Sequence, residues 1–190
     1  MDAWSLPCSV SYKGTDWQIH TDYLTVLDVL SIFKNHDLDN IEKCLYCLYQ
    51  LVVRFDDLQE DDYFPMYEKV REFIDMGQES KNNNTPSVMD WEQDAPLIIP
   101  EINKQLGNGL DVRTMPDMHW WTFLGYYMAI GECTYSHILS IRNKRAKGKK
   151  LEKWEKEYAN ENKDIVNLKH KLSEQEKEEK ARAQELFNRL

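Results

Sequence analysis

The sequence has few of the features that mark membrane, secreted or disulfide-bonded proteins. No apolar run approaches the roughly 20 residues of a membrane-spanning helix, and residues 1–4 begin neither the basic nor the apolar region of a secretory signal. Cysteine is scarce, with only Cys8, Cys44, Cys47 and Cys133. Because the sequence has neither a secretory signal nor a membrane span, we expect an intracellular location and no membrane partner. Disulfides are rare in such reducing compartments, so we also expect four free thiols.

The chain also lacks the motifs of the commonest catalytic and cofactor sites. Its five histidines never form the His-Glu-x-x-His pattern of zinc proteases. The glycines at 107–109 lack the third glycine and the strand of a dinucleotide-binding turn, and residues 148–151 lack the first glycine and the hydroxyl of a phosphate loop. Cys44 and Cys47 could supply only two of the four ligands that a structural zinc site needs. We therefore expect both to be small core residues instead of zinc ligands. The acidic run at 56–62 lacks the glycine and glutamate of a calcium loop. We therefore expect that the protein is not an enzyme and that it binds no metal or cofactor.

Charge is distributed unevenly along the chain, whose net charge is −9. Residues 1–142 hold 10 Lys and Arg against 23 Asp and Glu, a net charge of −13, whereas residues 143–190 carry a net charge of +4. An acidic body repels phosphate, so we do not expect nucleic acid as a partner. A nucleic-acid-binding regulator would have to use the five positive charges at 144–150. We rank this function below the two that are given at the end of this section.

The hydrophobic pattern predicts a mostly α fold: a helical bundle with a small N-terminal β-hairpin and a long C-terminal helical extension. Apolar residues alternate over 8–20 around a turn at Gly14, as in a hairpin. Apolar residues at helical spacing follow, with start signals at Asp22 and Asp39. We expect helices over 23–33, 41–55, 63–76, 91–106, 117–130 and 134–147, the fourth capped at residue 90 and kinked or split by two prolines, and an internal loop at 77–87.

The C-terminal part differs in composition from the rest and suggests a division into a body, 1–148, and a charged helical tail, 149–190. Apolar residues in the tail follow heptad spacing, but Glu161, Gln175 and Glu179 interrupt the seam. A helix with such a stripe needs a partner surface, either another copy or another protein. We expect the body to fold alone and the tail to be ordered by its partner through Leu151, Trp154, Tyr158, Ile165, Leu168 and Leu172. The alternative is that the tail packs back on its own body.

Residues 119–127 contain five aromatic side chains that cannot all lie on one face of a helix. The favoured interpretation places Trp121, Leu124 and Met128 in the core and Trp120 over a neighbouring helix. In the alternative, Trp120 and Tyr127 are exposed anchors for a partner protein, since Trp and Tyr dominate binding hot spots.

Four stretches together resemble the bacteriophage gene-product-fifteen family of tailed phages and prophages of Gram-positive bacteria. They are residues 21–22 (TD), 90–95 (DWEQDA), 119–124 (HWWTFL), and 141–142 (IR) followed by 148–155 (GKKLEKWE). The similarity covers the hairpin, all the helices and the start of the tail. It brings no catalytic residues with it.

The resemblance implies a place beside the tape-measure protein in the tail-assembly genes. It therefore implies a tail assembly chaperone of the host bacterial cytoplasm that binds the tape-measure protein, keeps it soluble and is absent from the mature virion. A neighbouring tail chaperone and a second copy of the chain are further candidate partners. The runner-up function is a structural virion component, such as a neck or tail-completion protein.

Overall fold

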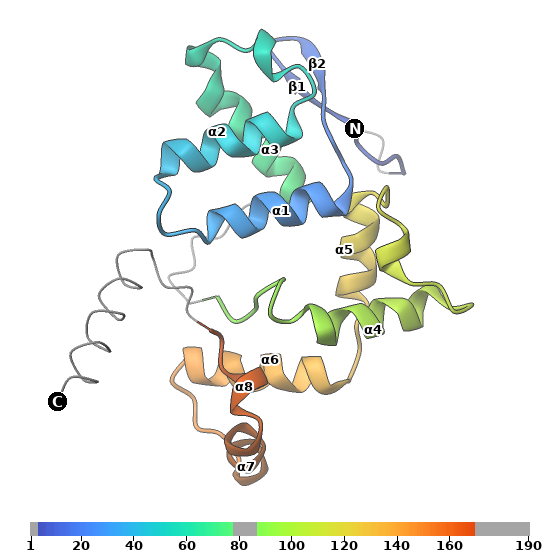
Figure 1. Cartoon of the computed structure of the whole chain (residues 1–190), viewed down its shortest axis with the longest axis vertical. Helices are drawn as coiled ribbons and strands as arrows, with labels where there is room; N and C mark the ends of the chain where they lie inside the picture. The colour runs from blue at the N-terminus through green and yellow to red at the C-terminus, as the bar shows by residue number, and fades with distance from the viewer. Residues whose placement is uncertain (1–3, 78–86, 170–190) are drawn as a thin grey trace, which may run out of the picture.

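The computed structural model describes residues 4–77 and 87–169 of the 190-residue chain. These residues form a mostly helical fold with one small N-terminal hairpin, which confirms the expected fold class. Figure 1 shows the hairpin and α1–α3 at one end, α4 and α5 in the middle, and α6–α8 at the other end. The interior of the loop expected at 77–87 lies outside the described residues.

The hairpin joins β1 (Ser9–Tyr12) to β2 (Thr15–Gln18) in antiparallel register, with Val10 opposite Trp17. The turn residues Lys13 and Gly14 both have positive φ, at 50° and 74°, as a two-residue hairpin turn of the favoured twist requires. The chain then continues beside the end of α2, where the amide of His20 donates to the carbonyl of Leu51 at 2.8 Å. The hairpin is thereby attached to the helices rather than standing alone.

Three helices pack beside the hairpin: α1 (Tyr23–Phe33), α2 (Asn40–Leu51) and α3 (Tyr63–Ile74). The predicted caps are confirmed, because Asp22 accepts from the amide of Thr25 and Asp39 forms a capping box with Glu42. Two short 3₁₀ turns, Phe55–Asp57 and Glu60–Asp62, occupy the acidic connector. The buried core of this group lies between the helices and includes Val26, Val29, Leu48, Leu51, Met66 and Val70.

The proline-containing helix α4 (Ala95–Leu106) begins later than its sequence pattern predicts. Asp90 does not cap a helix; its carboxylate accepts from the amides of Glu92 and Gln93 and closes a turn. Pro96 then lies in the first turn of α4, where a missing N–H costs little, and Pro100 lies inside the helix. The helix predicted over 91–106 is therefore shortened to Ala95–Leu106 and is not split at Pro100. The next helix, α5 (Trp120–Met128), packs against it.

The C-terminal end of the described chain comprises α6 (Thr134–Ala146), α7 (Lys153–Glu161) and α8 (Lys163–Val166). The tail is thus not one long helix over 149–169, since Asn162 separates two short ones. Both fold back on α6 around a second core cluster of Ile138, Ile141, Ala159 and Val166. Within the described ranges no helix is both long and apolar enough to cross a membrane.

Candidate functional site

The first candidate site is the aromatic stretch at the start of α5, and the structure corrects its predicted orientation. Trp120 is only 2% exposed, and its indole N–H donates to the carbonyl of Ile74 at 2.9 Å. Trp121 is half-buried against Phe73, while Met128 is 59% exposed. The core face therefore contains Trp120 rather than Met128, and Trp120 is not available as an exposed anchor.

Tyr127, the other proposed anchor, belongs to an aromatic cluster centred on Trp91. The rings of Trp91 and Tyr127 lie 4.7 Å apart, and Trp91 also contacts the rings of Trp120 and Phe123. The hydroxyl of Tyr127 lies 2.9 Å from that of Tyr135. Tyr127 is half-buried by these contacts within the chain, so only part of its ring is accessible to a partner.

The start of α5 is joined directly to the start of α1. The amide of Trp120 donates to the carbonyl of Thr21, and the amide of Tyr23 donates to that of Met118 at 2.9 Å. The ring of Tyr23 stacks on Phe123 with centroids 4.6 Å apart. Two of the four stretches that carry the family resemblance, 21–22 and 119–124, therefore hold each other in place.

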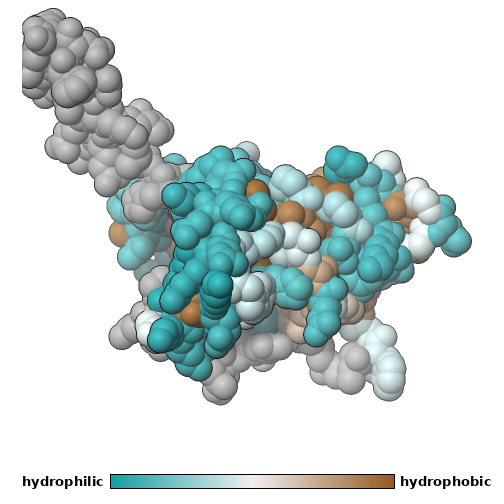
Figure 2. All heavy atoms as spheres, turned by 90° about the horizontal axis from the view of Figure 1, so that it is seen from below, coloured by the Kyte–Doolittle hydropathy of each residue, from teal (hydrophilic) through white to brown (hydrophobic). Residues whose placement is uncertain are grey.

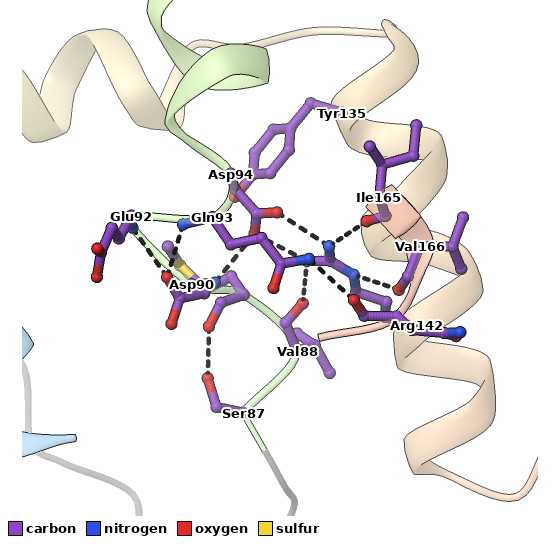
Figure 3. A network of polar contacts seen from close by, with 12 residues as sticks. Ser87, Val88, Asp90, Glu92, Gln93, Asp94, Tyr135, Arg142, Ile165 and Val166 are labelled. Carbon is purple, nitrogen blue, oxygen red and sulfur yellow. Dashed lines mark hydrogen bonds and ion pairs between the residues drawn. The ribbon is translucent and has the colours of Figure 1, made fainter. Parts of the chain in front are cut away.

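The other two stretches meet at Arg142, a residue of α6 that is 5% exposed (Figure 3). Its guanidinium donates two hydrogen bonds to the carboxylate of Asp94, at 2.8 and 2.9 Å. It also donates to the backbone carbonyls of Val88, Ile165 and Val166. Five hydrogen bonds use the five N–H groups that arginine has, so this buried charge is fully satisfied.

Side chains near Arg142 hold the rest of the described tail. Gln93 donates to the carbonyl of Asn167 and accepts from the amide of Lys169. The ammonium of Lys144 lies 2.6 Å from the carboxylate of Glu155, which is 1% exposed, and lowers the pKa of that carboxyl. These contacts hold α7 and the segment after α8 in place, and Gln93 and Glu155 belong to two of the stretches that carry the resemblance, 90–95 and 148–155.

The tail residues proposed to bind a partner are thus mostly engaged within the chain. Four of them are half-buried: Leu151, Tyr158, Ile165 and Leu168. Trp154 remains 53% exposed beside the ring of His137, and Leu172 lies outside the described residues. Seen from the end where α7 lies, the surface is largely hydrophilic with small apolar patches (Figure 2). Over residues 149–169 the structure agrees with the alternative in which the tail packs on its own body.

An apolar groove between α2 and α3, which sequence reasoning did not find, is the best-formed candidate binding surface. We call it the α2–α3 groove. It has a volume of about 850 Å³, and its apolar walls are Phe33, Ile41, Leu45, Tyr63, Phe64 and Tyr67. Ile41 and Phe64 are 70% and 67% exposed. The only signal in the sequence was the presence of apolar residues, such as Phe64, outside the inward faces of the two helices.

The cysteines and acidic residues do not form a chemical centre in the described part of the chain. All four thiols are unpaired, Cys8 is exposed, and burial raises the pKa of the Cys47 thiol to about 12. No group of three or more His, Cys, Asp or Glu residues able to hold a metal ion occurs within 4–77 and 87–169.

Comparison with known proteins agrees with the resemblance found in the sequence. No curated protein and no solved structure gives a significant match. The family model described as Bacteriophage Gp15 protein matches residues 4–168, which span the hairpin and every helix of the described chain. The chain therefore belongs to the bacteriophage Gp15 family.

Proposed function

We propose that this phage protein is a tail assembly chaperone that binds the tape-measure protein and keeps it soluble until the tail tube forms around it. The observation that carries the proposal is the α2–α3 groove, an open apolar surface on an acidic helical body. A holder of a long apolar helical chain needs such a surface for binding. It also needs net charge to keep the loaded complex dispersed.

The role is one of binding, without catalysis, in the cytoplasm of the host bacterium. Family membership supports a phage protein, and the groove supports a protein ligand rather than a small polar substrate. A neighbouring tail chaperone would be a second partner in the same complex.

The experiment is co-expression of the tape-measure protein of the same phage with and without the full chain. We expect the tape-measure protein in the supernatant, and co-purified with this chain, only when both are expressed. Tape-measure protein that is equally soluble alone, or that precipitates in both cases, would contradict the proposal.

Mass spectrometry of purified phage particles separates this role from a structural one. A chaperone leaves the assembled tail, so the chain should be absent from particles that contain the tape-measure protein. Its presence in fixed proportion to the tube subunits would instead identify a neck or tail-completion protein.

A further inference from the structure

We infer that the α2–α3 groove binds one amphipathic helix whose apolar stripe is flanked by lysine and arginine. The inference rests on the proposed function in taking that helix to be a segment of the tape-measure protein. It adds the place on this chain where the segment binds and the chemistry that selects it.

The shape of the groove suits a helix. Its walls come from residues 40–45 of α2 and 63–71 of α3, or roughly 8 to 12 Å of helix axis at about 1.5 Å per residue. Aromatic rings line it, with the ring of Tyr67 6.3 Å from that of Phe33 and 6.4 Å from that of Phe64. A groove of this length accommodates about two helical turns, which present apolar side chains at i, i+3 or i+4, and i+7.

The exposure of its walls indicates that the groove is not filled by the described chain. Ile41 and Phe64 lie on its two sides and are among the most exposed large apolar residues of the described ranges. Isolated exposed apolar residues are ordinary, but two that flank one apolar groove form a continuous surface. A partner helix would remove both side chains from water at once.

Charge at one end of the groove favours a basic occupant. Glu60 lines one end of the groove, and Asp61 follows it in the acidic connector. The side chains of Glu60 and Asp61 are exposed and form no ion pair within the described ranges. Elsewhere in the lining Arg71 is paired with Glu68 at 2.9 Å, and Lys43 balances the charge of Glu60, so the net negative charge comes from the connector beside Glu60.

The same charge argues against a second copy of this chain as the occupant. Residues 1–142 carry a net charge of −13, so two bodies brought together at this acidic surface would repel each other. A lysine- and arginine-flanked helix instead meets opposite charge at the Glu60 end of the groove, which increases its association rate and its selectivity.

The probes for the test are two designed, fluorescein-labelled helical peptides of about 18 residues, or five turns. Both have the same leucine stripe; one has lysine on its flanks and the other glutamate. Binding to the full chain is measured by fluorescence anisotropy. We expect the lysine peptide to bind at least about tenfold more tightly, with an affinity that falls as salt is added.

Substitutions then locate the site. Phe64→Ala and Ile41→Ala should each weaken the lysine peptide by about tenfold, whereas Met128→Ala, which removes an equally exposed side chain from α5, should leave binding unchanged. Glu60→Lys should weaken binding, and Glu132→Lys should not, although both alter the net charge by the same amount. Circular dichroism and thermal unfolding verify that each variant is folded.

Equal binding of the two peptides, or equal effects of the groove and control variants, would overturn the inference. A Phe64→Ala variant that converts a dimer into a monomer in analytical ultracentrifugation would also overturn it, because the occupant would then be a second copy. The inference fails alone if the groove variants still keep the tape-measure protein soluble. The proposed function fails alone if the wild-type chain binds the lysine peptide in the groove but leaves the tape-measure protein insoluble.

Discussion

Arg142 and Asp94, which are 48 residues apart in sequence, form a doubly hydrogen-bonded ion pair whose side chains are 5% and 1% exposed. Desolvating two charges is costly, and the cost is offset here because the remaining N–H groups of Arg142 reach three backbone carbonyls. The pair joins the turn before α4, the middle of α6 and the end of α8. These three segments are therefore expected to unfold together.

Replacing Arg142 with alanine should destabilise the protein by about 3–5 kcal/mol, because it leaves the Asp94 carboxylate buried without a countercharge. Arg142→Lys should be intermediate, since an ammonium keeps the charge but cannot reproduce the bidentate contact. Urea denaturation followed by circular dichroism measures both. Arg113→Ala is the control: Arg113 pairs with Asp111 at the surface, so its loss should leave the unfolding midpoint nearly unchanged. Similar midpoints for Arg142→Ala and Arg113→Ala would show that the buried pair does not determine stability.

The two adjacent tryptophans of α5 should differ in their contribution to stability. Trp120→Ala removes a buried ring and leaves the carbonyl of Ile74 without its donor, so it should cost about 3–5 kcal/mol. Trp121→Ala removes a half-buried ring and should cost less, although its indole N–H also donates, to the carbonyl of Phe73. Denaturant titration of the two variants gives the order directly. A larger loss for Trp121→Ala would support the orientation that the sequence pattern first suggested.

Features determined by neighbouring residues could be predicted from the sequence, and those determined by distant contacts could not. The hairpin and the caps at Asp22 and Asp39 depend on residues within a few positions of each other, and all are confirmed. The orientation of α5 depends on the hydrogen bond from the Trp120 indole to Ile74, 46 residues away. Because α5 is apolar on nearly every side, its sequence has no hydrophobic periodicity that identifies the buried face. The docking of α8 likewise depends on backbone carbonyls that bind Arg142, which leave no pattern in the sequence.

The candidate sites follow the same division. Leu151, Tyr158 and Ile165 belong to the apolar stripe predicted to need a covering surface, and the cluster around Ile138 and Ile141 of α6 provides that surface. The α2–α3 groove escaped notice because its two helices show regular inward faces. Ile41 shares its helical spacing with the apolar residues Leu45 and Leu48, yet it is 70% exposed, and the groove forms between it and Phe64 because of the way the two helices pack.

Acid should weaken the attachment of α7 through Glu155. The Lys144 ammonium lowers the pKa of the Glu155 carboxyl below its usual 4.5, so the folded state favours the ionised form. The contribution to stability is therefore present above the unfolded-state pKa and is lost as the pH falls through the folded-state pKa. Glu155→Gln should be less stable than wild type at neutral pH, and the difference should shrink in acid. Urea denaturation across this pH range tests it, and a difference that is constant with pH would exclude the ion pair as its cause.

Where the tail is cut should decide whether the rest of the chain is stable. A chain of residues 1–148 loses α7 and α8, exposes Ile138 and Ile141, and removes the Ile165 and Val166 carbonyls from Arg142. A chain of residues 1–169 keeps both helices. We expect the shorter chain to be less stable than the longer one by about 3 kcal/mol or more, because it uncovers apolar surface and leaves a buried charge partly unsatisfied.

Thermal unfolding of the two truncated chains measures this difference, and hydrogen exchange of the full chain provides an independent test. Amides in α7 and α8 should be protected in the isolated monomer, because their helices are covered by α6. Equal stability of the two chains, with rapid exchange over 153–166, would instead support a body that ends at residue 148 and a tail ordered only by a partner. In that case Trp154 and the apolar stripe around it would become the first surface to test for binding to the tape-measure protein, ahead of the α2–α3 groove.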